Sequence, residues 1–420
     1  MASRPQSLTD AQWRQLRFEA VRIFTPSTPI GVAELFSGRQ QQIQRLIDTV
    51  AEPGRHAIVY GEPGVGKTSL AQVIQHVIPA GNRRLTYVRK AAFSSDTFSS
   101  IWMSIFRDIR FTMDIGEGPK SYAIADAYQN GVTPSDVVRE LSYFTAEDVP
   151  IIVIDEYNLV KAKDQSKQMA ETIKAVSDEG LNVTIILVGI SDTVENLVEG
   201  HGSLSRCSEE VLMPRMSSHE MQILLESRMS RLKMKIHGDA KWKIINLAKG
   251  LPSFAHALGK SATLSAVDAR ALVVAERNVD HSIEDFLRAS QNSLKIDYEV
   301  AVRSNQERAR FRQILTACAM AITDESGYFT AKQVCQPLKR ILGRDIGIDG
   351  FNPNLKELAS AKRGSVLQQI GSERIYRYRF TDPAMQPYVV MKGIQDGFLD
   401  EQAKSALSAP EQGSLFPTAP

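Results

Sequence analysis

The sequence has few cysteines, no long apolar run and almost no excess of either charge. Its three cysteines include no Cys-x-x-Cys pair, and this odd, scattered set predicts neither a disulfide framework nor a zinc site. No stretch of about eighteen apolar residues occurs, and the first residues lack the apolar centre of a secretory signal. We therefore expect a cytoplasmic protein without a membrane partner. With 50 basic and 48 acidic side chains, composition alone demands no polyanionic partner.

The length of the chain, 420 residues, predicts several domains, because a single core rarely exceeds roughly 250 to 300 residues. Apolar runs at Ala57–Tyr60, Leu85–Val88, Ile151–Ile154 and Thr184–Gly189 alternate with helical patterns, which indicates an α/β sandwich around a parallel sheet. We expect an N-terminal helix and lead-in (1–33), an α/β core (34–213), a helical lid and linker (214–305), a mixed module (306–396) and a disordered tail (397–420).

The most specific motif is a glycine-rich loop between a predicted strand and a predicted helix. It reads Gly61-Glu62-Pro63-Gly64-Val65-Gly66-Lys67-Thr68-Ser69, the G-x-x-x-x-G-K-T pattern of a P-loop. Glycines let backbone N–H groups curl around a β-phosphate, Lys67 neutralises the β/γ oxygens and Thr68 holds Mg²⁺. The sequence therefore predicts ATP and Mg²⁺ as cofactors.

Two carboxylates end the predicted strand Ile151–Ile154. After a P-loop, such a strand is expected to supply a Walker B element, with Asp155 coordinating Mg²⁺. Glu156 would face the γ-phosphate and polarise the attacking water. We therefore predict an ATPase that converts ATP and water to ADP and phosphate. The alternative is a pair of exposed acidic residues at a strand end.

Polar residues also follow the next predicted strand, at Ser191 and Asp192. Either side chain would lie beside the γ-phosphate as a sensor, and either could instead cap a following helix.

With these motifs the chain resembles the AAA+ ATPases, in the branch of the origin-recognition initiators, STAND signalling ATPases and TniB-like transposition ATPases. The resemblance runs from about Glu34 to Leu258. Phe36-Ser37-Gly38-Arg39 is similar to the family's F-x-G-R segment, whose backbone lines the adenine pocket. The resemblance implies that Phe36, Gly38 and Arg39 contribute to nucleotide binding.

Two further segments carry the resemblance. Gly202–Cys207 is similar to the segment for an arginine finger, which implies that Arg206, with Arg215 in reserve, reaches the γ-phosphate of a neighbour in a homo-oligomer. Gly250-Leu251-Pro252 resembles the lid motif. Initiators carry an arginine just after it, whereas this chain has Ser253 and Phe254, leaving His256 as the cationic candidate beside Pro252. His256 could equally be a packed core residue.

Residues 308 to 390 resemble the winged-helix domain appended to origin-recognition ATPases. Residues 301–400 contain 15 basic and 10 acidic side chains, so positive charge is concentrated here. The resemblance implies double-stranded DNA as a partner, contacted from the third helix and the wing. The candidate contacts are Lys356, Lys362, Arg363, Arg374, Arg377 and Arg379. Alternatively, the module docks a protein and its arginines are solvated.

The tail contains Gln412-Gly413-Ser414-Leu415-Phe416, which resembles the bacterial sliding-clamp-binding peptide. Gln412 would bond at the edge of an apolar pocket filled by Leu415 and Phe416. An inert tail is the alternative reading.

Together these features predict an oligomerising AAA+ ATPase associated with DNA, of replication, transposition or mobile-element defence type. ATP binding would drive assembly and hydrolysis would reset it. The alternative is a STAND-like switch, whose nucleotide state controls a partner effector without direct DNA binding. No protease or nuclease motif is visible, so we expect a separate effector protein.

Overall fold

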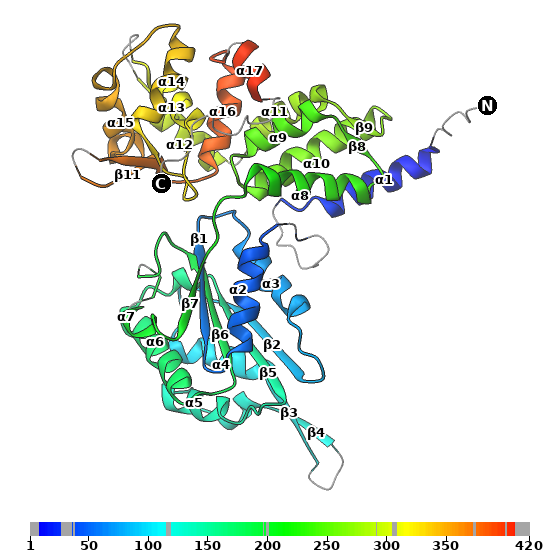
Figure 1. Ribbon diagram of the computed structural model, residues 1–420, viewed down its shortest axis with the longest axis vertical. Coiled ribbons are helices and arrows are strands. Elements are labelled where there is room, and N and C mark those ends of the chain that lie inside the picture. The colour runs from blue at the N-terminus through cyan, green and yellow to red at the C-terminus, as the bar shows by residue number, and fades with distance from the viewer. Residues whose placement is uncertain are drawn as a thin grey trace. The chain divides into compact units, whose positions relative to one another are not determined.

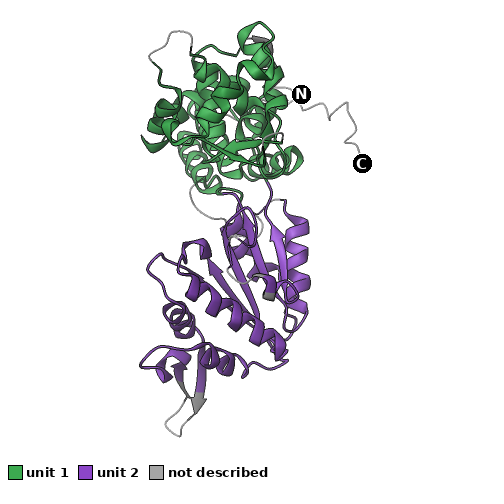
Figure 2. Cartoon of the chain, turned by 90° about the vertical axis from the view of Figure 1, so that its left-hand side faces the viewer, with its two compact units in different colours: residues 1–28, 63–65, 215–420 green, residues 29–62, 66–214 purple. Residues whose placement is uncertain are grey.

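The chain divides into two compact units in the computed structural model (Figure 2). We call Pro29–Glu62 with Gly66–Pro214 the core unit; the lid unit comprises Met1–Thr28, Pro63–Val65 and Arg215–Pro420. The structure describes residues 8–26, 36, 38–114, 119–195, 197–198, 201–290, 292–304, 309–372, 375–399 and 401–407. Within these ranges, no helix has the length and apolarity needed to cross a membrane.

The core unit is built on a parallel sheet with the strand order β2-β5-β6-β1-β7 (Figure 1). The strands are β1 (His56–Gly61), β2 (Arg84–Ala91), β5 (Asp148–Asp155), β6 (Thr184–Ile190) and β7 (Ser208–Leu212). Every neighbouring pair is parallel, so the carboxyl ends of all five strands meet at one edge. The predicted α/β sandwich is confirmed.

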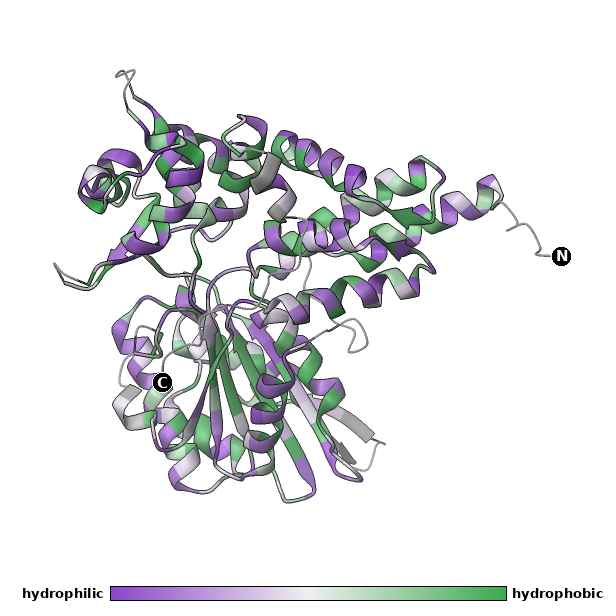
Figure 3. Ribbon diagram, turned by 45° about the horizontal axis from the view of Figure 1, so that its top comes forward, coloured by the Kyte–Doolittle hydropathy of each residue, from purple (hydrophilic) through white to green (hydrophobic). Residues whose placement is uncertain are grey.

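Helices cover both faces of this sheet. α2 (Gln40–Ala51) and α3 (Lys67–Val77) contact one face. The other face carries an apolar cluster with residues from α4 (Phe98–Asp108), α5 (Pro134–Leu141), α6 (Lys163–Asp178) and α7 (His201–Leu204). All eight residues of β5 are buried, which explains its continuous apolar run. Figure 3 shows the same hydrophobic colouring along the central strands.

Two features of the core unit were not predicted. Strand β7 has the sequence Ser-Glu-Glu-Val-Leu, so it carries no apolar run. The antiparallel pair β3 (Arg110–Asp114) and β4 (Pro119–Ala123) also lacks one. A continuous apolar run identifies only strands that are buried on both faces, so neither feature could be predicted in this way.

The first part of the lid unit is helical. Its helices are α1 (Asp10–Ile23), α8 (Ser218–Arg231), α9 (Gly238–Ala248), α10 (Pro252–Asp268), α11 (Glu276–Ala289) and α12 (Asn292–Val302). α10 packs against α1, α8, α9 and α11. The prediction of a helical lid and linker over residues 214–305 is wrong in one detail, because β8 (Lys235–Ile236) pairs in parallel with β9 (Val273–Val274).

The remainder of the lid unit contains a winged-helix-like module. Its elements are α13 (Phe311–Met320), β10 (Phe329–Thr330), α14 (Ala331–Leu342), α15 (Asn352–Leu358), β11 (Leu367–Ile370) and β12 (Arg377–Phe380). The strands form a small antiparallel sheet in the order β10-β12-β11. α16 (Met385–Gln395) packs against α13.

The predicted disordered tail needs correction at its start. Residues 401–407 form α17 (Glu401–Leu407), which packs against α9. Ala403 and Leu407 lie four residues apart on one helical face, and both are buried. Asn246 Nδ2 donates a hydrogen bond of 2.7 Å to the Leu407 carbonyl. The polar composition of the tail predicted disorder, but these two apolar side chains are enough to pack residues 401–407 against α9.

Candidate active site

The functional residues of the core unit gather where β1, β5 and β6 end. β6 lies between β1 and β5, and the registers pair Gly61 with Ile190 and Ile154 with Leu187. The segments that follow these strands therefore emerge at the same edge of the sheet. This edge brings together the P-loop, the carboxylates Asp155 and Glu156, and the segment that begins at Ser191.

Glycine is required in the P-loop for two physical reasons. Gly61, Gly64 and Gly66 have φ angles of 147°, 80° and 99°, a region that other residues rarely adopt. A Cβ atom on Gly61 would also lie 2.5 Å from the Met213 carbonyl oxygen, so a side chain does not fit. Gly66 precedes α3 directly, and the helix therefore begins at Lys67 with its N–H groups available to an anion.

Lys67 is buried beneath this loop. Its Nζ donates to the carbonyls of Gly61 at 3.0 Å and Glu62 at 2.7 Å. Burial lowers the pKa of the Lys67 ammonium to about 8, while Glu156, Asp155 and Glu62 partly oppose this shift. A bound anion would offset the desolvation that destabilises the charged form. The buried ammonium is thus suited to a phosphate group.

The two oxygens of Asp155 have different partners. Oδ1 accepts from Thr68 Oγ1 at 3.4 Å and from the Glu156 N–H at 2.9 Å. Oδ2 forms an ion pair of 2.6 Å with Arg89 of β2. The carboxylate is therefore fixed with one oxygen toward Thr68 and the other toward Arg89. The sequence pattern does not single out Arg89, because its one signal is a basic residue inside a strand adjacent to β5.

These oxygens fit Mg²⁺. This ion is usually held by one or two protein oxygens together with substrate phosphates, rather than by a full cage of side chains. The described residues contain no cluster of three or more His, Cys, Asp or Glu side chains suited to a metal ion. Thr68 and Asp155 would hold the ion, and this assignment stays a prediction.

Glu156 has an unusual backbone conformation. Its φ angle is 54°, in the left-handed region, and its carbonyl accepts from the Leu159 N–H at 2.9 Å. Non-glycine residues in this region carry strain of about 1 kcal/mol or more and are concentrated at functional sites. The chain thus reverses direction immediately after Asp155, and the Glu156 side chain is partly exposed.

The end of β6 is anchored by Asn158, another residue that no sequence motif indicates. Its Oδ1 accepts from the Ile190 N–H at 2.8 Å. Ser191 Oγ donates to the Thr193 carbonyl at 2.6 Å. No helix begins between residues 191 and 195, all of which are described, so neither Ser191 nor Asp192 is a helix cap there. Both residues follow β6, which is the neighbour of β1 in the sheet. Their role as sensors of the γ-phosphate stays a prediction.

Arg39 has a structural role in the core unit. It is buried, has a φ angle of 64°, and donates from Nη2 to the Pro214 carbonyl at 2.6 Å. It precedes α2 directly, after Gly38. Its guanidinium therefore ties this segment to the end of the core unit, and adenine contact by Phe36, Gly38 and Arg39 stays a prediction.

The two arginine-finger candidates differ in environment. Arg206 is exposed and precedes β7, and β7 begins opposite His56 at the start of β1. About 17 Å of extended strand separates that end of β1 from Gly61. Arg215, by contrast, is buried. Its Nη1 donates to the Lys249 carbonyl at 3.3 Å and to Gln386 Oε1 at 2.5 Å, both in the lid unit. These contacts remove Arg215 as a reserve finger.

His256 is a packed core residue, the second of the two readings. Its Nδ1 accepts from the Thr25 N–H at 3.2 Å and its ring meets Phe24 edge-on. Burial, followed by the charge of Arg228, lowers the His256 pKa to about 3. The ring is therefore neutral and supplies no positive charge. Pro252 is buried at the first position of α10, where proline favours helix initiation.

The predicted DNA contacts have diverse environments. Arg363 must be withdrawn: it is buried, pairs with Glu357 at 3.2 Å, bonds to the carbonyls of Ala301 and Arg303, and lies 3.7 Å from the Phe311 ring centre. On the wing, Arg377 pairs with Asp324, and Arg379 donates to Gln368 at 2.8 Å. At the third helix, Lys362 pairs with Glu357 at 3.1 Å, and Lys356 is exposed. Arg374, Gln412, Leu415 and Phe416 lie outside the described residues.

The parallel sheet, the P-loop at the end of β1 and the carboxylates at the end of β5 define a P-loop NTPase of the AAA+ type. Residues 26–293, more than half of the chain, match nSTAND1, described as Novel STAND NTPase 1. The chain belongs to this family of nucleotide-binding proteins. No curated protein matches it.

Solved structures of initiator proteins resemble the fold. The ORC2 protein of Aeropyrum pernix, in ADPNP–ADP complexes, has a TM-score of 0.50 and 14% identity, covering 92% of this chain and 98% of that chain. The ORC1 protein of Aeropyrum pernix, in complex with DNA, has a TM-score of 0.47 and 16% identity, covering 90% and 96%. At such identities the likeness concerns the fold alone.

Proposed function

We propose that this chain is a Mg²⁺-dependent ATPase that acts as a nucleotide-gated switch. The observation that carries the proposal is the convergence of Lys67, Thr68, Asp155 and Glu156 at one edge of the sheet. Lys67 would bind the phosphates and Glu156 would orient the attacking water. When bound, Mg²⁺ would neutralise charge on the phosphate oxygens; Thr68 and Asp155 would hold it.

The organisation of the lid unit supports a switch. The P-loop residues Pro63–Val65 are grouped with this unit. Within it, Arg215 joins Lys249 at the end of α9 to Gln386 of α16. The lid helices and the winged-helix-like module therefore form one body, and a nucleotide-dependent change in the lid would carry the module with it. The output would pass to a separate effector protein.

Glu156→Gln tests the hydrolytic assignment. The amide keeps the shape of the side chain but is a poor base, so turnover should fall about 100-fold with ATP binding retained. Single-turnover hydrolysis and equilibrium binding of labelled ATP measure the two properties separately. An unchanged hydrolysis rate would show that Glu156 does not activate the water.

We further propose that Arg206 completes the site of a neighbouring subunit. The support is its exposure and its position at the opposite end of β1 from the P-loop. Subunits carrying Arg206→Ala should regain activity when mixed with subunits carrying Lys67→Ala, because the mixture rebuilds some complete sites. Absence of rescue would argue against a shared site.

Association with DNA is a second candidate function. It is favoured by exposed Lys356 on α15 and by Lys362 just after it, whose side chain is 77% exposed. Duplex binding that weakens with salt, and weakens further in Lys356→Ala/Lys362→Ala, would support it. Because Arg363 is buried and Arg377 is paired, we expect weaker DNA binding than the basic composition suggested.

A further inference from the structure

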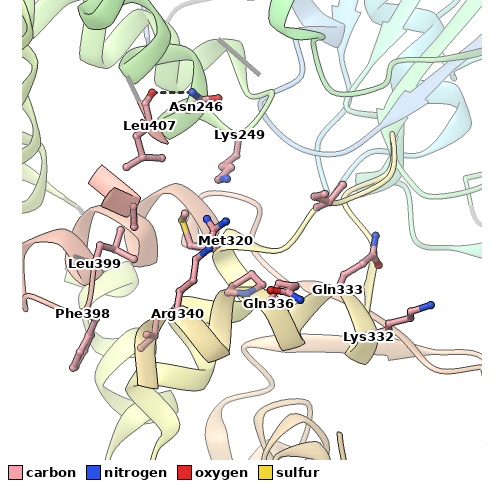
Figure 4. A pocket seen from close by; sticks show the side chains of 14 residues that line it. Asn246, Lys249, Met320, Lys332, Gln333, Gln336, Arg340, Phe398, Leu399 and Leu407 are labelled. Atoms are coloured by element: carbon pink, nitrogen blue, oxygen red, sulfur yellow. Dashed lines mark hydrogen bonds between the residues drawn. The ribbon is translucent and has the colours of Figure 1, made fainter. Parts of the chain in front are cut away.

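The lid unit contains a pocket that the nucleotide site does not use (Figure 4). Its volume is about 390 Å³, within the range of roughly 300 to 1,000 Å³ found for ligand sites. It is bounded by the end of α9, by α14 with the end of α13, and by Phe398, Leu399, Ala403 and Leu407. All of these elements belong to one compact unit.

The lining combines an apolar surface with positive charge. The charged members are Lys249, Lys332 and Arg340, and none of the described lining residues carries a carboxylate. Figure 4 shows Lys249 of the α9 end and Arg340 of α14 extending toward the same space. Lys332 and Arg340 place positive charge on the α14 side of the pocket, which favours an anionic group there.

Three polar side chains on α14, two of them cationic, form a regular row. Lys332, Gln336 and Arg340 are spaced by four residues and therefore lie on one helical face. All three are exposed, and none of their side chains has a hydrogen bond or ion pair with a described residue. Lys339, on another face of α14, is by contrast paired with Asp345 at 3.1 Å.

The apolar part of the pocket is incompletely covered. Ile322 is 79% exposed, more than any other large apolar side chain among the described residues. It lines the pocket together with Met320, Pro337 and Ile341. Pro337 lies inside α14 and has no N–H group to donate to the Gln333 carbonyl.

We propose that this pocket docks an acidic, amphipathic segment of a partner protein. Leucine or phenylalanine side chains would cover Ile322, Pro337 and Ile341, and neighbouring carboxylates would pair with Lys332 and Arg340. Charge complementarity selects an acidic partner over a neutral one. This inference goes beyond the ATPase assignment, because docking requires neither Lys67 nor Glu156.

A labelled synthetic peptide of twelve residues, with Glu alternating with Leu and Phe at helical spacing, tests the proposal on the full chain. Fluorescence anisotropy should show saturable binding, with a Kd on the order of 10 μM, that weakens as salt rises. A peptide with Lys in place of Glu, and one with Ser in place of Leu and Phe, should bind at least tenfold more weakly. Equal binding of either control peptide, or no saturable binding of the acidic one, would overturn the proposal.

Protein variants locate the binding. Lys332→Glu/Arg340→Glu should weaken binding at least tenfold, as should Ile322→Ser. Arg344→Glu reverses one charge, half the change made by the double variant, on an exposed residue outside the pocket and should leave binding unchanged. Thermal unfolding checks that each variant is folded; should a variant unfold, the peptide controls still decide. Wild-type affinity in a folded double variant would refute the assignment.

Two other occupants are distinguishable. If the peptide binds after removal of residues 408–420 but not to the full chain, the pocket belongs to the chain's own tail. If Ile322→Ser dissolves a dimer seen by sedimentation, the pocket is an interface between copies. Either result would overturn docking of a separate acidic partner. Measuring Lys67→Ala in parallel separates failure of docking from failure of the ATPase proposal.

Discussion

In the core unit, Lys67, Arg89 and Asp155 are gathered at one edge of a sheet, whereas in the lid unit Arg215 and Arg363 are each bound to carbonyls and side chains of neighbouring helices. In the first case strand ends position the charges where a ligand can reach them. In the second the charges join elements to one another. The same residue types thus indicate a ligand site in one unit and internal cohesion in the other.

The largest expected effect concerns the ligand site. Lys67→Ala should weaken ATP binding roughly 1,000-fold, or about 4 kcal/mol, because the phosphates lose a buried cation. Stability should change little, which equilibrium binding and thermal unfolding can establish together. Lys174→Ala removes an exposed lysine of the same unit and should affect neither. If Lys67→Ala unfolds the protein, Lys67 instead stabilises the fold of the core unit.

The complementary prediction concerns cohesion. Arg363→Ala should destabilise the lid unit by about 3 kcal/mol, since it leaves the carbonyls of Ala301 and Arg303 without their buried donor and Glu357 with only the exposed Lys362 as a partner. Lys362→Ala, its exposed neighbour, should cost no more than about 0.5 kcal/mol. Denaturant unfolding measures both. Equal effects of the two substitutions would mean that Arg363 behaves as a surface residue.

Among the described side chains, each unit has one buried histidine whose Nδ1 accepts a backbone N–H: His56 from Ile185 at 3.1 Å and His256 from Thr25 at 3.2 Å. Burial is the main cause that lowers their pKa values, to about 4 for His56 and about 3 for His256. The unfolded chain, with a histidine pKa near 6.5, therefore binds protons first as pH falls.

Stability should accordingly be complete above pH 6.5 and decline toward pH 4, by about 2 kcal/mol per histidine at pH 5. His56→Gln and His256→Gln should each reduce this acid loss, as shown by unfolding free energies at pH 7.5 and pH 5. If neither variant changes the difference between the two pH values, the histidines are not the acid-sensitive groups.

The smallest expected effect tests the link between Arg89 and Asp155. Arg89→Ala should raise the Mg²⁺ concentration needed for half-maximal turnover about tenfold, or about 1.4 kcal/mol, because Asp155 would lose a fixed orientation. Nucleotide binding without Mg²⁺ should be unchanged, and Arg89→Lys should recover part of the loss. Lys90→Ala is the control, since Lys90 pairs with Asp108 instead. If Arg89→Ala needs the same Mg²⁺ concentration as the unsubstituted protein, Arg89 does not orient Asp155 for Mg²⁺ binding.

The sequence predicted features that depend on local pattern. The buried strands β1, β5 and β6 are continuous apolar runs, and the P-loop is a contiguous motif whose glycines have positive φ angles. Features that depend on distant partners were missed. Arg89 meets a carboxylate 66 positions away, and Arg363 bonds to a carbonyl 62 positions away. Charge counts predicted exposed arginines, whereas burial depends on packing that composition does not record.

The left-handed backbone at Glu156 would be visible in a library of all substitutions at that position. Because the bend favours residues that tolerate positive φ, Gly and Asn should be enriched among variants that fold well but do not hydrolyse ATP. Valine and isoleucine should be depleted from the folded pool altogether, because branching at Cβ opposes this conformation. Position 156 would thus report two selections in one experiment, one for the shape of the chain and one for its chemistry.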